Sequence, residues 1–357
     1  MVLDLDKVII NLKELDSQMV QSEIDFKPLL SKIHPLNSKR ALNLLHYLSL
    51  RNHDIRELQD ELHSAGLSSM ASSESHIRHQ LISILHRLGV EKEWPDSIYS
   101  FQMAKGSLEG HVSALFGKKS DDGGPYLMVT FDEELADNYA KVKGLLLSGM
   151  NVARINCAHD DESTWIRMIQ HIKRASRITG VECKIYMDLA GPKIRTVLKG
   201  REKLKIKEGH SFYLTDEENL EKGMVGCTIA GIVAQSKSGE TVLFDDGLIE
   251  ARVDKVEDNK ARLQVIRISS KKPYIKSEKG INFPDSSLGM SALTEYDMKC
   301  LPLIVRHADM IGYSFVRSAD DVDQLLNLLP SGKKPYLIIK IETPEAVKNL
   351  PQLLFAG

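Results

Sequence analysis

Apolar residues recur at helical spacing through the first part of the chain. Val8, Leu12 and Leu15 fall on one face of a segment spanning residues 5–33, which predicts an amphipathic helix. Further helices are predicted at 38–50, 54–65 and 73–88, with Ser38, Asp54 and Ser73 as N-cap residues. Residues 1–117 are therefore predicted to form a small helical domain, followed by a polar linker at 118–125 that ends in Gly-Gly-Pro.

From residue 126 onward, short apolar runs alternate with helical patterns. Such alternation favours a parallel sheet or an α/β barrel, because each strand is covered by the helices that connect it to the next. The predicted strands are 126–131, 151–156, 182–188, 310–316 and 336–341, and the predicted helices are 133–147, 162–178 and 319–329.

The helical signal disappears between residues 197 and 284. Ile249, Ala251 and Val253 alternate with polar residues, and the alternation resumes at Ala261 after an Asp-Asn turn. This period of two predicts a small all-β module inserted into the α/β domain.

Charge and cysteine content narrow the class of protein. The chain of 357 residues has 47 basic and 49 acidic residues, so no overall field attracts nucleic acid or an anionic membrane. The four cysteines form no C-x-x-C pair, which argues against a zinc site or disulfide framework and is typical of a reducing cytoplasm. No apolar run is long enough to span a membrane, and the acidic start is unlike a signal peptide.

Charged and polar side chains cluster where the predicted strands end. Arg154, Asp188, Ser314, Lys340 and Glu342 all follow or close such strands, and in α/β barrels this rim carries the chemistry. Each residue has a structural alternative. Arg154 and Asp188 could form a barrel salt bridge, and Lys340 and Glu342 could lie on a solvated edge.

Taken together and in order, six segments resemble those of pyruvate kinases. Residues 151–159 (NVARINCAH) resemble NVARLNFSH, and 188–196 (DLAGPKIRT) resemble D-x-x-GP-[EK]-IRT. Residues 245–249 (DDGLI), 279–284 (KGINFP), 314–317 (SFVR) and 340–342 (KIE) resemble DDGLI, KGVNLP, SFIR and KIE. The resemblance implies a TIM-type barrel over 125–196 and 285–357, incomplete at its C-terminal side. It also implies that residues 197–284 are the mobile lid.

The resemblance implies a reaction and a phosphate site. It implies transfer of a phosphoryl group from phosphoenolpyruvate to ADP, giving pyruvate and ATP. Arg154 would hold the transferring phosphate, Ser314 would contact the substrate, and Lys340 would neutralise charge during transfer. Glu342 would be a ligand of Mg²⁺ or Mn²⁺.

The resemblance also implies a nucleotide site. His159, Arg195, Lys279 and Asp246 fall on the family's nucleotide side of the cleft, with Asp246 on the lid. Closure of the lid would exclude water from the reacting phosphate.

The family's monovalent cation site is altered in this chain. Asn156, Asp188 and the carbonyl of Leu189 fall on K⁺ ligands, but Ala158 replaces a Ser ligand. Lys193 occupies the position that is Lys in members working without K⁺, and its ammonium would substitute for the ion. The expectation is therefore activity that does not require K⁺.

Two further departures concern the barrel. Residues 128–132 (MVTFD) replace the family's CTIGP, and the sequence ends at Gly357, before the G-D-L segment that carries a second metal ligand. We interpret the chain as part of a longer enzyme whose remainder is needed for activity. The alternative is a catalytically silent relative that acts as a regulatory or binding protein. An aldolase-like or carboxylase-like lyase fits less well, because those barrels lack the inserted lid.

The helical domain lies outside the resemblance. Residues 54–62, the Gly-Leu-Ser-Ser turn at 66–69 and residues 73–88 are similar to a SAP-type nucleic-acid module. Asp60 and Glu61 oppose phosphate binding, so a packing or oligomerisation bundle is favoured, and the full-length protein is expected to be a homo-oligomer.

Overall fold

The computed structural model describes residues 4–118, 123–200, 203–217, 220–269, 273–286, 288–332 and 334–356. The chain divides into two compact units, Met1–Lys119 and Ser120–Phe355, and each is described by itself. Part of the linker predicted at 118–125 lies outside the described residues. None of the helices described has both the length and the apolar character needed to cross a bilayer.

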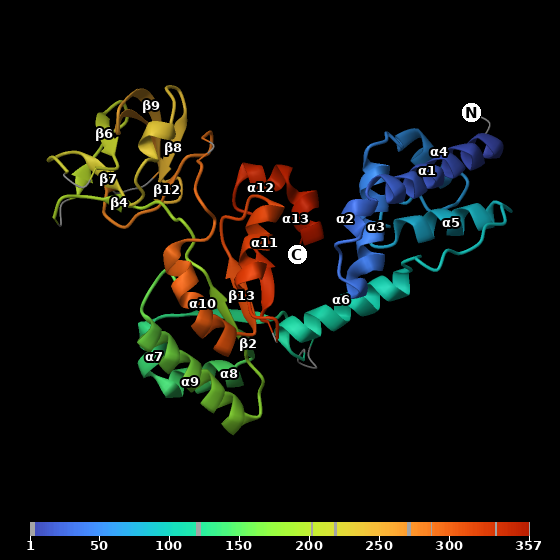
Figure 1. Cartoon of the computed structure of the whole chain (residues 1–357), viewed down its shortest axis with the longest axis horizontal. Helices are drawn as coiled ribbons and strands as arrows, with labels where there is room; N and C mark the ends of the chain where they lie inside the picture. The colour runs from blue at the N-terminus through green and yellow to red at the C-terminus, as the bar shows by residue number, and fades with distance from the viewer. Residues whose placement is uncertain are drawn as a thin grey trace. The chain divides into compact units, whose positions relative to one another are not determined.

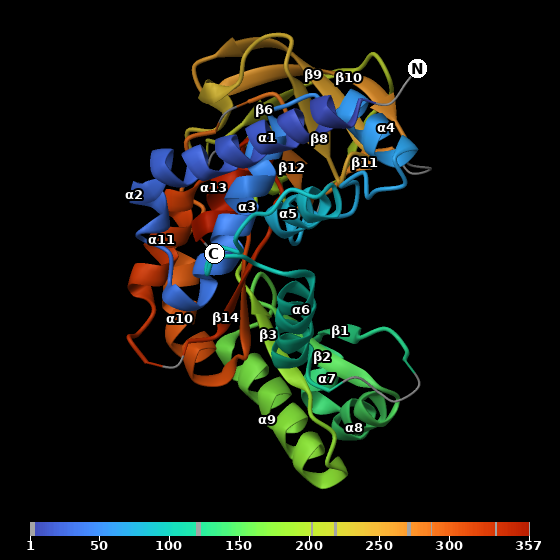
Figure 2. The same ribbon diagram turned by 90° about the vertical axis from the view of Figure 1, so that its right-hand side faces the viewer.

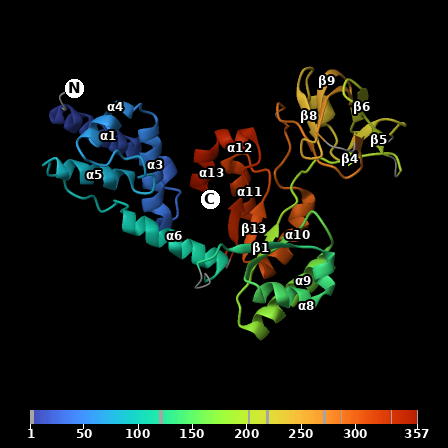
Figure 3. The same cartoon turned by 180° about the vertical axis from the view of Figure 1, so that it is seen from behind.

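The first unit is helical (Figure 3). Its core joins Val8, Leu12 and Met19 to Leu62 and Leu81, all fully buried. Its helices are α1 (Leu5–Asp25), α2 (Lys27–Leu30), α3 (Ser38–Arg51), α4 (Arg56–Ser64), α5 (Ile77–Arg87) and α6 (Phe101–Phe116), with a 3₁₀ turn at Pro35–Asn37.

Several helix boundaries differ from the prediction. The helix predicted to reach residue 33 ends at Asp25, and Pro28 then lies in the short helix that follows. None of the three predicted N-cap residues directly precedes its helix, although Asp54 Oδ1 accepts from the N–H of Arg56, the first residue of α4. Asn37, Ile55 and His76 precede the helices instead, and Ser73 donates to the carbonyl of Met70. Helix α6 was not predicted, and none of its residues is buried.

The second unit contains a five-stranded parallel sheet in the order β1-β2-β3-β13-β14. This confirms the α/β class and the parallel sheet. Figures 1 and 2 label several of its strands. Its strands are β1 (Leu127–Phe131), β2 (Met150–Asn156), β3 (Lys184–Asp188), β13 (Met310–Tyr313) and β14 (Tyr336–Ile339).

Helices connect these strands and cover the sheet. The single helix predicted at 133–147 is two helices, because Asn138 breaks it and its side chain caps the second by accepting from Lys141 N. The helices are α7 (Glu133–Asp137), α8 (Tyr139–Leu147), α9 (Glu162–Thr179), α10 (Glu295–His307), α11 (Ala319–Leu328), α12 (Pro344–Lys348) and α13 (Leu350–Ala356).

Between β3 and α10 the chain forms a β-module, seen in yellow in Figure 1. A seven-stranded sheet has the order β12-β8-β9-β10-β6-β7-β4, and β5 pairs with β11. Ile249, Ala251 and Val253 are buried, as their alternation predicts. The strands are β4 (Thr196–Val197), β5 (Leu204–Lys205), β6 (Ser211–Thr215), β7 (Val225–Cys227), β8 (Thr241–Phe244), β9 (Ile249–Glu257), β10 (Lys260–Ile268), β11 (Tyr274–Ile275) and β12 (Ile281–Asn282), with a 3₁₀ turn at Val233–Gln235.

Candidate active site

The parallel register gathers side chains from different strands at one edge of the sheet. Asn156 lies opposite Asp188, and Asp188 lies opposite Gly312. Since side chains two residues apart share a face of a strand, Arg154 and Asn156 of β2 project on the same side as Asp188.

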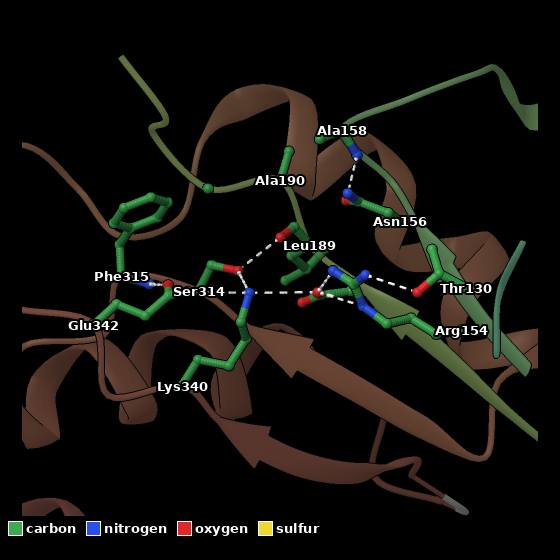
Figure 4. Close-up of polar contacts among 12 residues, drawn as sticks. Thr130, Arg154, Asn156, Ala158, Leu189, Ala190, Ser314, Phe315, Lys340 and Glu342 are labelled. Atoms are coloured by element: carbon green, nitrogen blue, oxygen red, sulfur yellow. Dashed lines mark hydrogen bonds and ion pairs between the residues drawn. The ribbon is translucent and has the colours of Figure 1, made fainter. Parts of the chain in front are cut away.

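Asp188 is the centre of the resulting cluster, and it is only 1% exposed. Its Oδ2 accepts from Arg154 Nη2 at 2.6 Å and Nε at 3.1 Å, and it lies 3.3 Å from Lys340 Nζ. Arg154 also donates to Thr130 on β1 (Figure 4). One carboxylate thus holds two cationic side chains that come from β2 and from the residue following β14.

Lys340 links this carboxylate to the adjacent strand ends (Figure 4). Its Nζ lies 2.8 Å from Ser314 Oγ, and Ser314 donates to the carbonyl of Leu189 at 2.9 Å. Glu342 lies 3.3 Å from Lys340 Nζ through Oε1, and its Oε2 accepts from Phe315 N at 3.0 Å. The structure therefore brings Arg154, Asp188, Ser314, Lys340 and Glu342 together.

The second oxygen of Asp188 has different surroundings. Oδ1 is buried and has no hydrogen-bond partner among the described residues. Tyr186 lies on the same face of β3, and burial, followed by the charge of Asp188, raises the pKa of its phenol. A side chain at Gly312 would collide with both the Tyr186 hydroxyl and this oxygen. The room for Tyr186 and Asp188 thus depends on a glycine in the neighbouring strand.

A second polar group forms where the β-module joins the sheet. Arg195 donates to the carbonyl of Glu278 at 3.0 Å and pairs with Gly280 in an isolated β-bridge. Lys279 forms an ion pair with Asp245 at 2.8 Å. The motif pair DDGLI and KGINFP is therefore brought together at this junction.

Other candidates lie apart from these groups. His159 is exposed, and its carbonyl accepts from Trp165. Asn156 Oδ1 accepts from Ala158 N (Figure 4). Lys193 is exposed and lies beside Gly280, and within the described chain no hydrogen bond or ion pair joins it to Asp188.

A cleft of about 630 Å³ opens beside the cluster. Lys193 and Pro192 line one part of it, Phe283 and Arg317 another, and Glu342 reaches it from the strand end. The cleft therefore lies between the sheet's edge and the segment that returns from the β-module.

The donor atoms for a divalent cation are few. No group of three His, Cys, Asp or Glu side chains with suitable geometry occurs in the described ranges. Glu342 offers one carboxylate at the cleft. One carboxylate fits Mg²⁺ or Mn²⁺ when substrate phosphates supply other oxygens, because Mg²⁺ is commonly bound in that way.

Residues 127–357 match the family model for the pyruvate kinase barrel domain. The chain belongs to the pyruvate kinase family. It is 31% identical over 228 residues to a pyruvate kinase of Geobacillus stearothermophilus, covering 62% of this chain and 38% of that protein. It is 31% identical over 221 residues to one of Thermotoga maritima, covering 61% of this chain and 47% of that protein. This pyruvate kinase relative thus spans less than half of the length of either.

Sequence reasoning missed three residues that shape the site of this pyruvate kinase relative. Tyr186 lies with Asp188 against Gly312. Phe315 donates to Glu342 and lies against Gly191 in the loop after β3. The carboxylate of Asp297 accepts from a backbone N–H of that loop. Tyr186 shares the two-residue spacing with Asp188, which would have placed it on the same face. The sequence has no local signal for the contact made by Asp297.

Proposed function

We propose that the sheet-edge cluster binds phosphoenolpyruvate and takes part in phosphoryl transfer to ADP. The observation that carries the proposal is the convergence of Arg154 and Lys340 on Asp188, with about a quarter of each cationic side chain exposed. Preorganised cations stabilise the negative charge on a transferring phosphoryl group and on the enolate left behind.

Each side chain of the cluster then has a separate task. Arg154 presents a fork of donors that fits phosphate oxygens. Lys340 places a compact charge where the phosphoryl group leaves, and Ser314 holds its ammonium through the 2.8 Å contact. Asp188 fixes both cations in the ground state, so little reorganisation is needed on binding.

A divalent ion, Mg²⁺ or Mn²⁺, would be held by Glu342 together with phosphate oxygens. When bound, it would neutralise charge on those oxygens during transfer. The carboxylate of Glu342 is already oriented by the N–H of Phe315.

The nucleotide is proposed to bind between the sheet's edge and the β-module. Arg195 and Lys279 supply positive charge at the junction, with Asp246 on the module and His159 beyond the end of β2. In this proposal residues 197–284 act as a lid on the barrel segments 125–196 and 285–357. Residues 1–117 form a separate packing or oligomerisation domain.

K⁺ is proposed to be dispensable because the ammonium of Lys193 would substitute for the ion. The supporting residue pattern is Lys193 together with Ala158 in place of an oxygen ligand. The rate with Mg²⁺ should change less than about twofold when K⁺ replaces a large organic cation. A strong K⁺ requirement would contradict this part of the proposal.

The direct test is pyruvate formation by the full gene product, coupled to lactate dehydrogenase. Lys340→Met should lower the rate by at least about 100-fold, as expected when a charge that stabilises the transition state is lost. Lys141→Met is a matched control, since Lys141 is an exposed residue of α8 that pairs with Glu134. Equal rates for Lys340→Met and the unaltered protein would refute the assignment.

The alternative is a binding or regulatory protein that does not turn over. In that case phosphoenolpyruvate would still bind through Arg154, but no pyruvate would form with either Mg²⁺ or Mn²⁺.

A further inference from the structure

Asp297 is a buried carboxylate that sequence reasoning left without a role. It is the third residue of α10 and is fully buried, with 0% exposure. Together with Thr294 it forms a capping box, in which each side chain binds the other's backbone N–H. Because an unpaired buried charge is costly, both oxygens of Asp297 need hydrogen-bond donors. These donors identify the segments of the chain that Asp297 binds.

The two oxygens of Asp297 have different partners. Oδ2 accepts from Thr294 N at 3.0 Å and from Thr294 Oγ1 at 2.6 Å, which completes the helix cap. Oδ1 accepts from the backbone N–H groups of Ala190 at 3.0 Å and Gly191 at 3.3 Å. The second pair spans more than 100 residues of sequence and plays no part in capping the helix.

A second helix of the same unit shows that a capping box can form without hydrogen bonds to a distant loop. Helix α11 begins with the same box, formed by Ser318 and Asp321. Asp321 Oδ2 accepts from the N–H groups of Ser318 and Arg317, which directly precede that helix. Asp297 therefore does what a capping aspartate does and also binds a distant loop.

The loop held by Asp297 carries atoms of the phosphate cluster. Leu189 directly precedes it, and the Leu189 carbonyl accepts from Ser314, which contacts Lys340. Gly191 has a φ of +63°, and a Cβ there would lie 2.7 Å from the ring of Phe315. The N–H of Phe315 in turn orients Glu342. The position of this loop thus affects both Lys340 and Glu342.

We propose that Asp297 is a positioning residue that locks the Ala190–Gly191 backbone, so that Ser314 and Phe315 hold Lys340 and Glu342 in their working geometry. This inference rests on the proposed phosphoryl-transfer function. Asp297 itself forms no hydrogen bond with Lys340 or Glu342, and its effect on the reaction passes through the loop.

Hydrogen exchange in the unaltered full chain gives the first test. The amides of Ala190 and Gly191 lie outside any helix or strand, yet they should exchange at least about 100-fold more slowly than free loop amides, because both are bound to a buried acceptor. Exchange at the rate of an open loop would overturn the proposal without any variant being made.

Two variants separate positioning from capping. Asp297→Asn keeps the shape but turns one oxygen into a donor, which then faces donor groups. It should accelerate exchange at residues 190–191 at least about tenfold. Thr294→Ala weakens the cap but leaves the loop contacts, so exchange there should change less than about threefold. Equal acceleration in both variants would refute a separate role for Asp297.

Kinetics of the same variants supply an independent measure. Asp297→Asn should lower kcat at least about tenfold while the KM for phosphoenolpyruvate changes less than about threefold, because Arg154 still binds the ground-state phosphate. Thr294→Ala should change neither value by more than about threefold. If Asp297→Asn changed KM alone and left kcat unaltered, the result would contradict the proposal. If the unaltered protein makes no pyruvate, the proposed function fails, whereas the exchange results still decide the role of Asp297.

Discussion

Two aspartates, one in each unit, each hold two cations while being only 1% exposed. In the helical unit, Asp16 binds Arg78 through Oδ1 at 2.9 Å and Lys92 through Oδ2. In the sheet, Asp188 binds both of its cations through Oδ2, and its other oxygen has no partner in the described part of the chain. The first carboxylate is fully satisfied and the second is not.

The cations around these two aspartates also differ. Arg78 is 9% exposed and binds a second carboxylate, Glu23, at 2.9 Å. Arg154 and Lys340 are 26% and 27% exposed. The two lysines do not differ in this way, since Lys92 is 32% exposed. The contrast lies in the arginines: Arg78 is buried between two carboxylates, whereas Arg154 is partly open and pairs with one, so it can also bind an anion. We therefore interpret Asp16 as structural and Asp188 as part of a binding site.

The largest effect is expected from breaking the structural network. Arg78→Met should destabilise the helical unit by about 3 kcal/mol, because it leaves buried carboxylates without their main partner. Urea unfolding followed by Trp94 fluorescence in a Trp165→Phe background measures this, since each unit contains one tryptophan. Arg56→Met is the control and should leave the transition unchanged, because the pair of Arg56 with Asp54 is exposed to solvent. A loss below about 1 kcal/mol would contradict a structural role for this network.

A smaller loss is expected from crowding the site around Asp188. Gly312→Ala should destabilise the second unit by about 2 kcal/mol, because the added methyl group collides with Tyr186 and Asp188. Unfolding followed by Trp165 in a Trp94→Phe background measures the loss. Gly144→Ala in α8 is a matched control with open space around it, and it should stabilise slightly, since alanine favours a helix. If both substitutions had the same effect, the close packing around Asp188 would be disproved.

The sequence predicts the sheet well because its strands are short apolar runs with polar residues at their ends. Even there, the strand predicted at 310–316 ends at Tyr313, and the backbone then turns through a positive φ at Phe315. The ordered motifs identify the cluster residues, but their contacts are not local. Asp188 and Lys340 are 152 residues apart, and Asp297 and Ala190 are 107 apart.

In the helical unit, the sequence pattern did not predict one helix and three N-terminal boundaries. Helix α6 was missed, and it has no buried residue that would mark a core-facing stripe. The caps at Ser38, Asp54 and Ser73 were misplaced because a polar residue before an apolar run fits either a cap or a turn. Asp54, for example, accepts from the backbone N–H of Arg56 at the start of α4 and also binds its guanidinium, but the residue directly before that helix is Ile55.

The smallest effect is a pH dependence of the helical unit. Burial lowers the pKa of His46, His76 and His79. A folded pKa below the unfolded value of about 6.5 gives stability that is present above that pH and is lost as the pH falls. Burial alone would raise the pKa of Asp16, but hydrogen bonds from Arg78 and Lys92 outweigh it and lower the pKa. The stability that Asp16 contributes to the helical unit is therefore lost only at lower pH, below about 3.9.

The helical unit should accordingly lose stability in two stages during acidification. Unfolding curves followed by Trp94 should shift to lower urea between pH 7 and pH 5, and again below about pH 4. In Asp16→Asn the second stage should shrink while the first remains. A midpoint that stays constant from pH 7 to pH 5 would contradict the contribution from the histidines.

The central claim is that the cluster around Asp188 is an anion site, and binding of phosphoenolpyruvate tests it most directly. Calorimetric titration of this chain with phosphoenolpyruvate and Mg²⁺ should show binding that Arg154→Met weakens at least about tenfold, or about 1.4 kcal/mol. Arg167→Met, which removes a half-exposed cation of α9 paired with Asp137, should bind as the unaltered chain does. No binding by the unaltered chain, or equal binding by Arg154→Met, would contradict the account.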